Sequence, residues 1–197
     1  MILNRIERWA INHPLRGMWQ KRVETPKLLR LGGRCDGALA LEIGGGQGLG
    51  AELIRSAFGA REVVSLDLDF AMTRRAQDRT ENLDHCSVVQ ADCTALPMPS
   101  DRFDALFDFG VLHHVPQWQQ AVAELSRVAR PGARLYTMEM YRSFICHPLW
   151  RRLLEHPQTN RFSHDEFMNC WREHGWQPTG DNTLTSGMGW STYRLRS

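Results

Sequence analysis

The chain has 197 residues, a length within the range of a single domain with a sizeable buried core. Its 42% hydrophobic and 23% charged residues are ordinary for a globular protein. Five cysteines without any C-x-x-C pair suggest neither a disulfide framework nor a zinc ribbon. No apolar run approaches the roughly 20 residues that span a bilayer, and charges interrupt the apolar start of the chain, unlike a signal sequence. We therefore expect a cytoplasmic, reduced protein.

The net charge of +2 conceals a basic N-terminal segment. Residues 1–34 contain eight Lys or Arg and two acidic residues, a balance of +6, and the rest of the chain carries −4. Such an arm could contact an anionic substrate, lipid head groups or nucleic acid. A solvated helix face is the simpler interpretation, and both stay open.

Hydrophobic periodicity predicts the elements in chain order. Apolar residues at helical spacing predict a helix near residues 2–10 and a second over 15–31, interrupted near Pro26. Strands and helices then alternate, which predicts an α/β fold with right-handed crossovers and a parallel sheet covered on both faces. The expected strands are 38–43, 62–68, 86–90, 103–109 and 133–140, and the expected helices are 49–58, 70–80 and 118–129.

The last part of the sequence predicts one helix and two strands. Ser163 and the acidic residues after it are typical of a helix N-terminus, and Gly175 is typical of its end. Residues 176–196 would supply the two final strands. We divide the chain into a helical arm over 1–34 and an α/β domain over 35–197, in which 141–162 forms an acceptor-side insertion.

The stretch Leu41–Gly50, LEIGGGQGLG, is the most informative of the chain. Its alternate glycines, Gly44, Gly46 and Gly48, stand where a predicted strand turns into a predicted helix. Bare backbone there lets a ligand approach the main chain and leaves amide groups free to hold a negative group. The spacing is G-x-G-x-G, because Leu49 occupies the position where the dinucleotide fingerprint G-x-G-x-x-G needs glycine.

This loop resembles motif I of the class I S-adenosylmethionine-dependent methyltransferases, and four further segments match in order. Val64–Met72 resembles the segment whose acid binds the ribose, and Gln90–Pro99 the segment whose acid reaches the adenine amino group. Phe103–Val115 and Glu124–Leu135 resemble the fourth strand with its loop and the turn into the fifth. The subgroup most similar is that of small-molecule, quinone-biosynthesis-like enzymes (methyltransferase type 11).

The resemblance implies a fold and a cofactor. The fold is Rossmann-like and doubly wound, with a mostly parallel seven-stranded sheet, one antiparallel strand near an edge, helices on both faces and a helical N-terminal extension. The cofactor is S-adenosyl-L-methionine. Asp67 would accept from the ribose hydroxyls, while its rival Asp69 has a structural role as a helix cap. Glu42, in place of the commoner Asp, would hold the ammonium group or order the loop. The expected cofactor-binding residues are Glu42, Gly44, Gly46, Gly48, Asp67, Leu68, Asp92, Cys93 and Phe109.

Catalytic residues are harder to assign, because methyl transfer from a sulfonium mainly needs positioning and the exclusion of water. His113 and His114 follow the fourth strand, at the end of the sheet where ligands bind in open α/β folds. One could remove a proton from an acceptor hydroxyl, or could order the loop. Glu139 and Tyr141, around the end of the fifth strand, could position an acceptor. Our catalytic candidates are His113, His114 and Glu139, and we expect no metal site.

The leading functional interpretation is a methyltransferase for a small-molecule acceptor. A non-catalytic module that binds the cofactor and acts through a partner is one alternative, and a nucleic-acid methyltransferase is another. The sequence argues against the latter, since it lacks both an N/D-P-P-Y/F/W signature after the fourth strand and a Pro-Cys pair. Peripheral membrane contact through Ile2, Ile6 and Trp9 stays open, as do the acceptor and the oligomeric state. Trp9, Trp19 and Trp150 are candidates to line the acceptor site.

Overall fold

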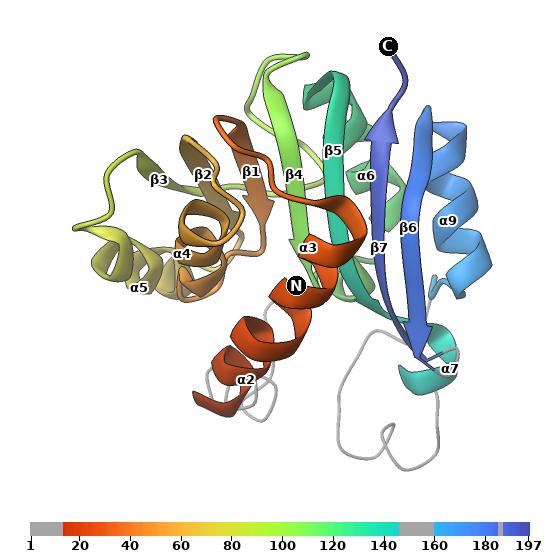
Figure 1. Cartoon of the computed structure of the whole chain (residues 1–197), viewed down its shortest axis with the longest axis horizontal. Coiled ribbons are helices and arrows are strands. Elements are labelled where there is room, and N and C mark those ends of the chain that lie inside the picture. The colour runs from red at the N-terminus through yellow and green to blue at the C-terminus, as the bar shows by residue number, and fades with distance from the viewer. Residues whose placement is uncertain (1–13, 146–159, 185–186) are drawn as a thin grey trace.

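A seven-stranded sheet forms the centre of the protein (Figure 1). The computed structural model describes residues 14–145, 160–184 and 187–197. The strands follow the order β3-β2-β1-β4-β5-β7-β6, and among these described strands β7 alone runs in the opposite direction to the others. This arrangement confirms the expected mostly parallel sheet with one antiparallel strand near an edge. The strands are β1 (Leu39–Ile43), β2 (Glu62–Asp67), β3 (Cys86–Gln90), β4 (Phe103–Phe109), β5 (Ala129–Met140), β6 (Trp176–Leu184) and β7 (Met188–Leu195).

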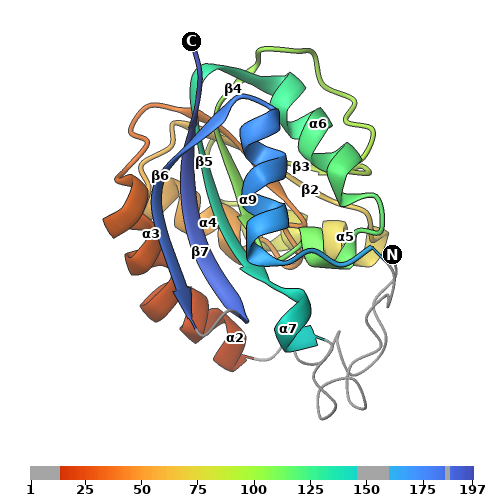
Figure 2. The same ribbon diagram turned by 90° about the vertical axis from the view of Figure 1, so that its right-hand side faces the viewer.

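Helices cover both faces of the sheet (Figure 2). The described helical elements are α2 (Pro14–Trp19), the π-turn η1 (Gln20–Glu24), α3 (Thr25–Gly32), α4 (Leu49–Ser56), α5 (Phe70–Thr80), the 3₁₀ turn η2 (Leu112–His114), α6 (Trp118–Val128), α7 (Arg142–Ile145) and α9 (His164–Glu173). Helices α3 and α4 bury apolar side chains in a cluster on one face, and α6 and α9 contribute to a second cluster on the other. The predicted two-sided cover is therefore confirmed.

Aromatic side chains fill the cluster beneath α3 and α4. Phe107 of β4 stacks on Tyr136 of β5, with ring centroids 4.6 Å apart. Phe58, just after α4, meets both rings edge-on, at 4.9 Å from Phe107 and 5.1 Å from Tyr136. All three rings are almost fully buried. Removal of so much apolar surface from water, at about 25 cal/mol per Å², holds the strands that carry the functional loops in place.

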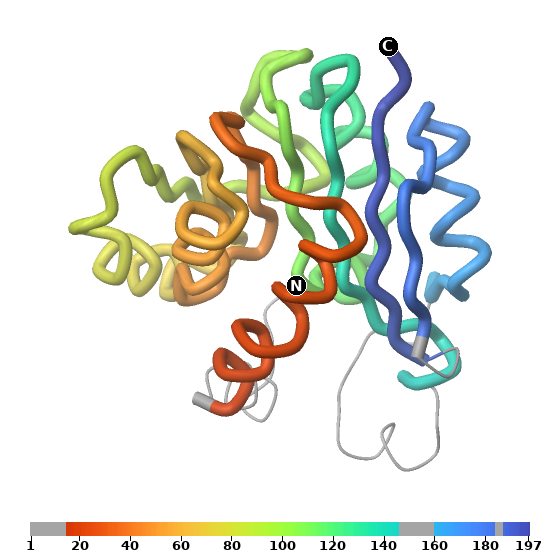
Figure 3. The backbone as a smooth tube through the Cα atoms, viewed as in Figure 1, coloured from red at the N-terminus to blue at the C-terminus, as the bar shows by residue number. Residues whose placement is uncertain are grey.

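The α-helical hydrogen-bond pattern is interrupted just before Pro26, close to the predicted position, but the helical backbone does not break there. Helical backbone runs from Pro14 to Gly32 and passes through the π-turn, in which the Thr25 amide donates to the Gln20 carbonyl. Pro26 stands in the first turn of α3, directly after this change in hydrogen-bond pattern, so its missing N–H is tolerated. As a result α3 continues over β5, β7 and β6 (Figure 3).

Strand β5 begins earlier than expected, at Ala129 instead of residue 133. Ala129 pairs with Phe103, and the register then shifts, so that Ala105 pairs with Arg134. Gly132, with φ of +78°, lies within this irregular part of the strand. Pro131 and Gly132, residues typical of a turn, therefore form a bulge within β5. The strand continues because β5 pairs with β4 both before and after the bulge.

Some expectations concern segments beyond the described residues. These are the helix near residues 2–10, most of the 141–162 insertion, and the side chains of Ile2, Ile6, Trp9 and Trp150. In the described part of the chain, no helix combines the length and apolarity that crossing a membrane requires. The cysteines described there, all free thiols, are Cys35, Cys86, Cys93 and Cys170.

Candidate functional site

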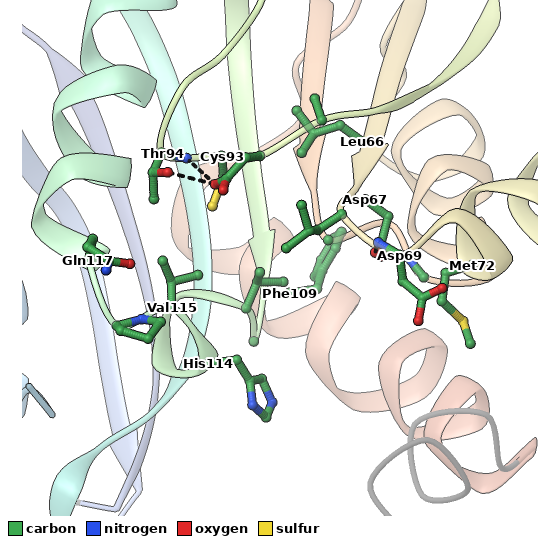
Figure 4. Close-up of a pocket in the computed structure, with 18 of the residues that line it drawn as sticks. Leu66, Asp67, Asp69, Met72, Cys93, Thr94, Phe109, His114, Val115 and Gln117 are labelled. Carbon is green, nitrogen blue, oxygen red and sulfur yellow. Dashed lines mark hydrogen bonds between the residues drawn. The ribbon is translucent and has the colours of Figure 1, made fainter. Parts of the chain in front are cut away.

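A cavity of about 250 Å³ opens at the carboxyl ends of the parallel strands (Figure 4). This is the end at which open α/β sheets bind ligands. The expected site residues on its wall are Gly44, Gly46, Asp67, Leu68, Asp92, Cys93, Phe109 and His114. The expected site residues that do not line it are Glu42, Gly48, His113 and Glu139. The site residues predicted from the sequence thus fall into two groups, those that line the cavity and those that do not.

The three alternate glycines have different tasks, although all have positive φ angles. A Cβ on Gly44 would come within 2.3 Å of Val111, so this glycine allows two loops to approach each other. Gly48 begins α4 and lies against α5, where a Cβ would meet Ala76 at 3.2 Å. At Gly46 a Cβ would meet only the Gly44 carbonyl, at 4.0 Å. Gly46 therefore presents bare backbone to open space in the cavity.

Asp67 joins the glycine loop to the turn after β2. One carboxylate oxygen accepts from the Gly46 amide at 2.9 Å, and the other accepts from the Asp69 amide at 2.8 Å. Each carboxylate oxygen keeps further acceptor capacity for a ligand. Burial raises the pKa of Asp67. Its rival Asp69 caps α5 by accepting from the Ala71 amide at 2.8 Å, which confirms the expected helix cap.

Asp92 follows β3 and also lines the cavity, and its neighbours Cys93 and Thr94 lie on the side opposite Asp67 and Asp69 in Figure 4. Its Oδ1 accepts from both the amide and the hydroxyl of Thr94, at 2.8 and 2.7 Å, and this closes a tight turn (Figure 4). Cys93 lines the same stretch of wall and is largely buried, whereas Leu68 is 44% exposed. An exposed carboxylate and an apolar rim residue suit a flat ring that carries an amino group.

Glu42 is buried beneath the glycine loop. The Ser65 hydroxyl donates to its Oε2 at 2.6 Å. A Cβ on Gly50 would come 1.6 Å from the other carboxylate oxygen, so the first turn of α4 lies directly on this side chain. Burial raises the pKa of Glu42 to about 7. Of the two roles left open by the sequence, these contacts favour ordering of the loop.

Arg16 of α2 is a wall residue that sequence reasoning missed. One guanidinium nitrogen donates to the buried carboxylate of Glu24 at 3.0 Å, and another donates to the Phe109 carbonyl at 3.3 Å. The first contact fixes the side chain against its own helix, and the second places it at the end of β4. The basic character of residues 1–34 was the available signal, but it marked no single residue.

Behind the wall, buried acidic groups hold the loop after β4. Glu139 accepts from the Leu112 amide at 2.7 Å, from the Met140 amide at 3.1 Å and pairs with His113 Nδ1 at 2.5 Å. Asp108 accepts from the Val111 amide at 2.9 Å. Burial raises the pKa of Glu139 to about 7; burial, together with the nearby charge of Glu139, also raises the pKa of Asp108. Both acids therefore favour their protonated forms more than exposed carboxyl groups do.

His114 is the histidine of the pair that reaches the cavity. Its ring centroid lies 4.1 Å from that of His113, so the buried and the lining imidazoles are in contact. The wall around His114 is mostly apolar and includes Val115 and Met140. Tyr141 is buried instead, with its hydroxyl 3.0 Å from His164 Nδ1. One titratable ring thus stands in an apolar part of the cavity.

The sequence match to a family covers the strands that build this cavity. Residues 41–137 match the family of the methyltransferase domain. Together with the fold and the site, this match supports the prediction from the sequence motifs that the chain is a class I S-adenosylmethionine-dependent methyltransferase. The match also lies in the subgroup that the motifs indicated.

Curated relatives agree over the same region. A Mycolicibacterium smegmatis protein described as a probable S-adenosylmethionine-dependent methyltransferase is 37% identical over 114 residues, which cover 58% of this chain and 42% of that protein. The ubiquinone/menaquinone biosynthesis C-methyltransferase UbiE of Pectobacterium carotovorum is 34% identical over 53% of this chain and 43% of its own length. The matches thus span less than half the length of these relatives.

Solved structures share the fold at low sequence identity. A chain from the complex of the Haloferax volcanii Trm112 methyltransferase activator with a methyltransferase superposes with a TM-score of 0.81, at 18% identity and full coverage of both chains. An Aquifex aeolicus methyltransferase gives 0.75 at 16% identity, over 98% of this chain and all of that one. The [4+2]-cyclase SpnF gives 0.74 at 16% identity, over 90% of this chain and 82% of that one.

S-adenosylmethionine is the cofactor of this family, and the residues present fit it. The open space at Gly46 admits a ligand close to the main chain. Asp67 and Asp92 offer carboxylate acceptors on either side, and Arg16 offers a cation near the end of β4. Hydroxyl, amino and carboxylate groups of one elongated ligand would therefore each meet a complementary partner.

The raised pKa of Glu42 predicts how stability depends on pH. The folded protein keeps a proton on Glu42 up to about pH 7, whereas the unfolded chain releases it near 4.5. The protonated Glu42 therefore stabilises the folded state fully below pH 4.5, and this stabilisation is lost as the pH rises through about 7. Glu42→Gln cannot ionise, so its free energy of unfolding relative to wild type should rise by about 2 kcal/mol between about pH 5 and pH 8. Urea denaturation at both pH values measures this difference.

The exposed acid Glu81 provides the matched control. Glu81→Gln makes the same chemical change at the end of α5, and its stability relative to wild type should be nearly constant over this range. A Glu42→Gln difference that does not change with pH would show that Glu42 ionises normally in the folded protein.

Proposed function

We propose that this chain is an S-adenosylmethionine-dependent methyltransferase that methylates a small-molecule acceptor. The observation that carries the proposal is the Asp67 carboxylate, which two backbone amides hold at the rim of the cavity beside the bare backbone of Gly46. When bound, S-adenosylmethionine supplies a methyl group activated by the sulfonium charge, for in-line displacement at carbon. The protein then has to hold the donor, orient the acceptor and exclude water.

Three charged residues would hold the donor. Asp67 accepts from both ribose hydroxyls, and Asp92 accepts from the adenine amino group, with Leu68 against the ring. Arg16 pairs with the carboxylate of the methionine part, because it is the arginine that lines the cavity and lies near the end of β4. Glycines 44, 46 and 48 shape the loop around the donor, and Glu42 supports it from below. Cys93 and Phe109 complete the wall.

On the acceptor side, His114 is the residue that we assign to proton removal. It lines the cavity, whereas His113 and Glu139 are buried and fix the same loop from behind. Glu139 binds two backbone amides and His113, so it acts through the position of the loop. We therefore retain His114 as the catalytic candidate and assign His113 and Glu139 to positioning. The arm over 1–34 and the insertion over 141–162 would cover this side.

Two alternatives keep the same cavity. A module that binds the cofactor without turnover would share every contact described above, and a fold alone does not determine the reaction. A nucleic-acid acceptor would draw on the basic N-terminal segment, and RNA or DNA binding that weakens steeply with salt would support it. The apolar surroundings of His114 favour a small organic acceptor over a nucleic acid. Turnover with quinols, phenols, amines and thiols would establish the enzymatic function.

Loss of the Asp67 carboxylate should weaken binding of the donor. Asp67→Ala removes the acceptor for two hydroxyl groups, and we expect its affinity for S-adenosylhomocysteine to fall at least tenfold, which corresponds to about 1.4 kcal/mol. Isothermal titration calorimetry measures the change. Asp78→Ala removes an exposed acid from α5 and serves as the control, with unchanged affinity. No binding by the wild-type protein would contradict the proposal.

The proposed contact of Arg16 with the amino-acid carboxylate can be tested with two ligands, one that has this carboxylate and one that lacks it. Arg16→Met should weaken S-adenosylhomocysteine binding about tenfold, because the amino-acid carboxylate loses its partner. The same variant should bind 5′-methylthioadenosine as tightly as wild type does, since that ligand has no carboxylate. Asp67→Ala should weaken both ligands. Equal losses for both ligands in Arg16→Met would indicate damage to the fold instead of a lost ion pair.

His114 and Glu139 should affect turnover without affecting donor binding. With an acceptor hydroxyl that must lose its proton, His114→Gln should lower kcat about 10²- to 10⁴-fold, the usual contribution of a general base. Glu139→Gln should lower kcat less and remove a titration near pH 7 from the pH–rate profile. Both variants should keep S-adenosylhomocysteine affinity within about twofold of wild type. An unchanged kcat in His114→Gln would exclude the assigned role.

A further inference from the structure

Exposed apolar side chains stand on two elements that contribute to the cavity wall, α2 through Arg16 and the turn from β2 into α5 through Leu68. On α2, Leu15 is 63%, Met18 46% and Trp19 44% exposed. On the turn from β2 into α5, Leu68 is 44% and Phe70 63% exposed. These five are the large apolar side chains with notable exposure in the described part of the chain. Single exposed apolar residues are ordinary, but a group of them at one site marks an interaction surface.

The cavity itself connects the two groups. Arg16, between Leu15 and Met18 in sequence, lines the cavity from α2, and Leu68 lines it from the β2–α5 turn. Leu15, Met18 and Trp19 have the i, i+3, i+4 spacing that brings side chains to one helix face. Both α2 and α5 lie toward the end of the molecule to which β1 and β4 point (Figure 1). We call the five apolar residues together the mouth surface.

Basic side chains accompany the mouth surface on both sides. Lys21 and Arg22 are exposed in the π-turn that follows α2, and Arg74 and Arg75 are exposed in α5. The acid of this π-turn, Glu24, is buried and paired with Arg16. Apolar and aromatic side chains that enter the acyl boundary, flanked by Lys and Arg that meet anionic head groups, are the pattern of interfacial membrane binding.

The position of the mouth surface distinguishes a membrane from a protein partner. A rigid partner that covered residues on both sides of the cavity would close the opening through which an acceptor must pass. A fluid bilayer covers the same side chains and still allows small molecules to exchange. Trp19 suits this environment, because an indole combines an apolar ring with a polar N–H, and its N–H is already directed to Glu24.

We propose that the mouth surface docks on an anionic lipid bilayer, with the cavity open toward the membrane. The docking depends only on the exposed apolar and basic residues. Its consequence, that a lipid-dissolved acceptor enters the cavity from the bilayer, rests on the proposed methyltransferase function. This placement deepens that function by naming the phase from which the acceptor comes.

Vesicle co-sedimentation tests the docking with the full chain. Wild type should bind phosphatidylcholine vesicles that contain phosphatidylserine at least tenfold more tightly than vesicles without it, and added salt should weaken this binding. Met18→Glu and Phe70→Glu each introduce an acid on a different element, and each should reduce binding at least tenfold. Lys21→Glu should remove most of the preference for the anionic lipid.

Controls keep the two proposals separable. Arg172→Glu makes the same charge change as Lys21→Glu on α9, away from the cavity, and should keep vesicle binding within about twofold of wild type. Met18→Glu should keep S-adenosylhomocysteine affinity, which shows that it folds. Vesicle binding without affinity for S-adenosylhomocysteine would leave the docking intact and refute the proposed function.

Three results would overturn the docking. The first is no binding to either kind of vesicle, and the second is equal binding by wild type, Met18→Glu and Phe70→Glu. The third is a concentration-dependent dimer in light scattering that Phe70→Glu abolishes, because the mouth surface would then bind a second copy of the chain.

Discussion

The carboxylate of Asp67 is the contact on which the candidate site depends. It spans the distance between two loops that leave neighbouring strands, and it uses one oxygen for each. Because β1 and β2 are parallel and in register, their ends arrive together, and a short acidic side chain is sufficient to join the loops. The same carboxylate faces the cavity, so a group that orders the apo protein is also directed toward a ligand. Little rearrangement is then needed on binding, which lowers the entropic cost of association.

A second layer of acidic groups supports the first. Glu42 lies under the glycine loop, and Glu139 and Asp108 lie behind the loop after β4. Buried carboxyl groups are costly when ionised, and the protein offsets that cost with backbone amide donors and with partial protonation. These side chains accept hydrogen bonds that a buried loop would otherwise leave unsatisfied. Their raised pKa values therefore follow from burial in positions that support the loops, and do not by themselves identify catalytic groups.

The sequence predicts most of the fold and several of the residues that line the cavity. Ordered motifs placed the glycine loop and Asp67, because strand ends and glycine spacing are local properties of the chain. They could not separate His113 from His114, since a single 3₁₀ turn decides which neighbour is buried and which reaches the cavity. They also missed Arg16, whose contact with Phe109 joins positions 93 residues apart in sequence.

The placement of β7 has a consequence for assembly of the sheet. β6 precedes β7 in the chain, yet its partner in the described sheet is β7, which in turn pairs with β5. β6 therefore has no neighbour in the sheet until the strand after it inserts, and this insertion joins residues as distant in sequence as Arg134 and Arg194. Such long-range pairing is slow compared with helix formation. Until it is complete, the edge of β5 and the apolar side chain of Trp176 are exposed to other chains, so this edge is a site at which a nascent molecule could aggregate.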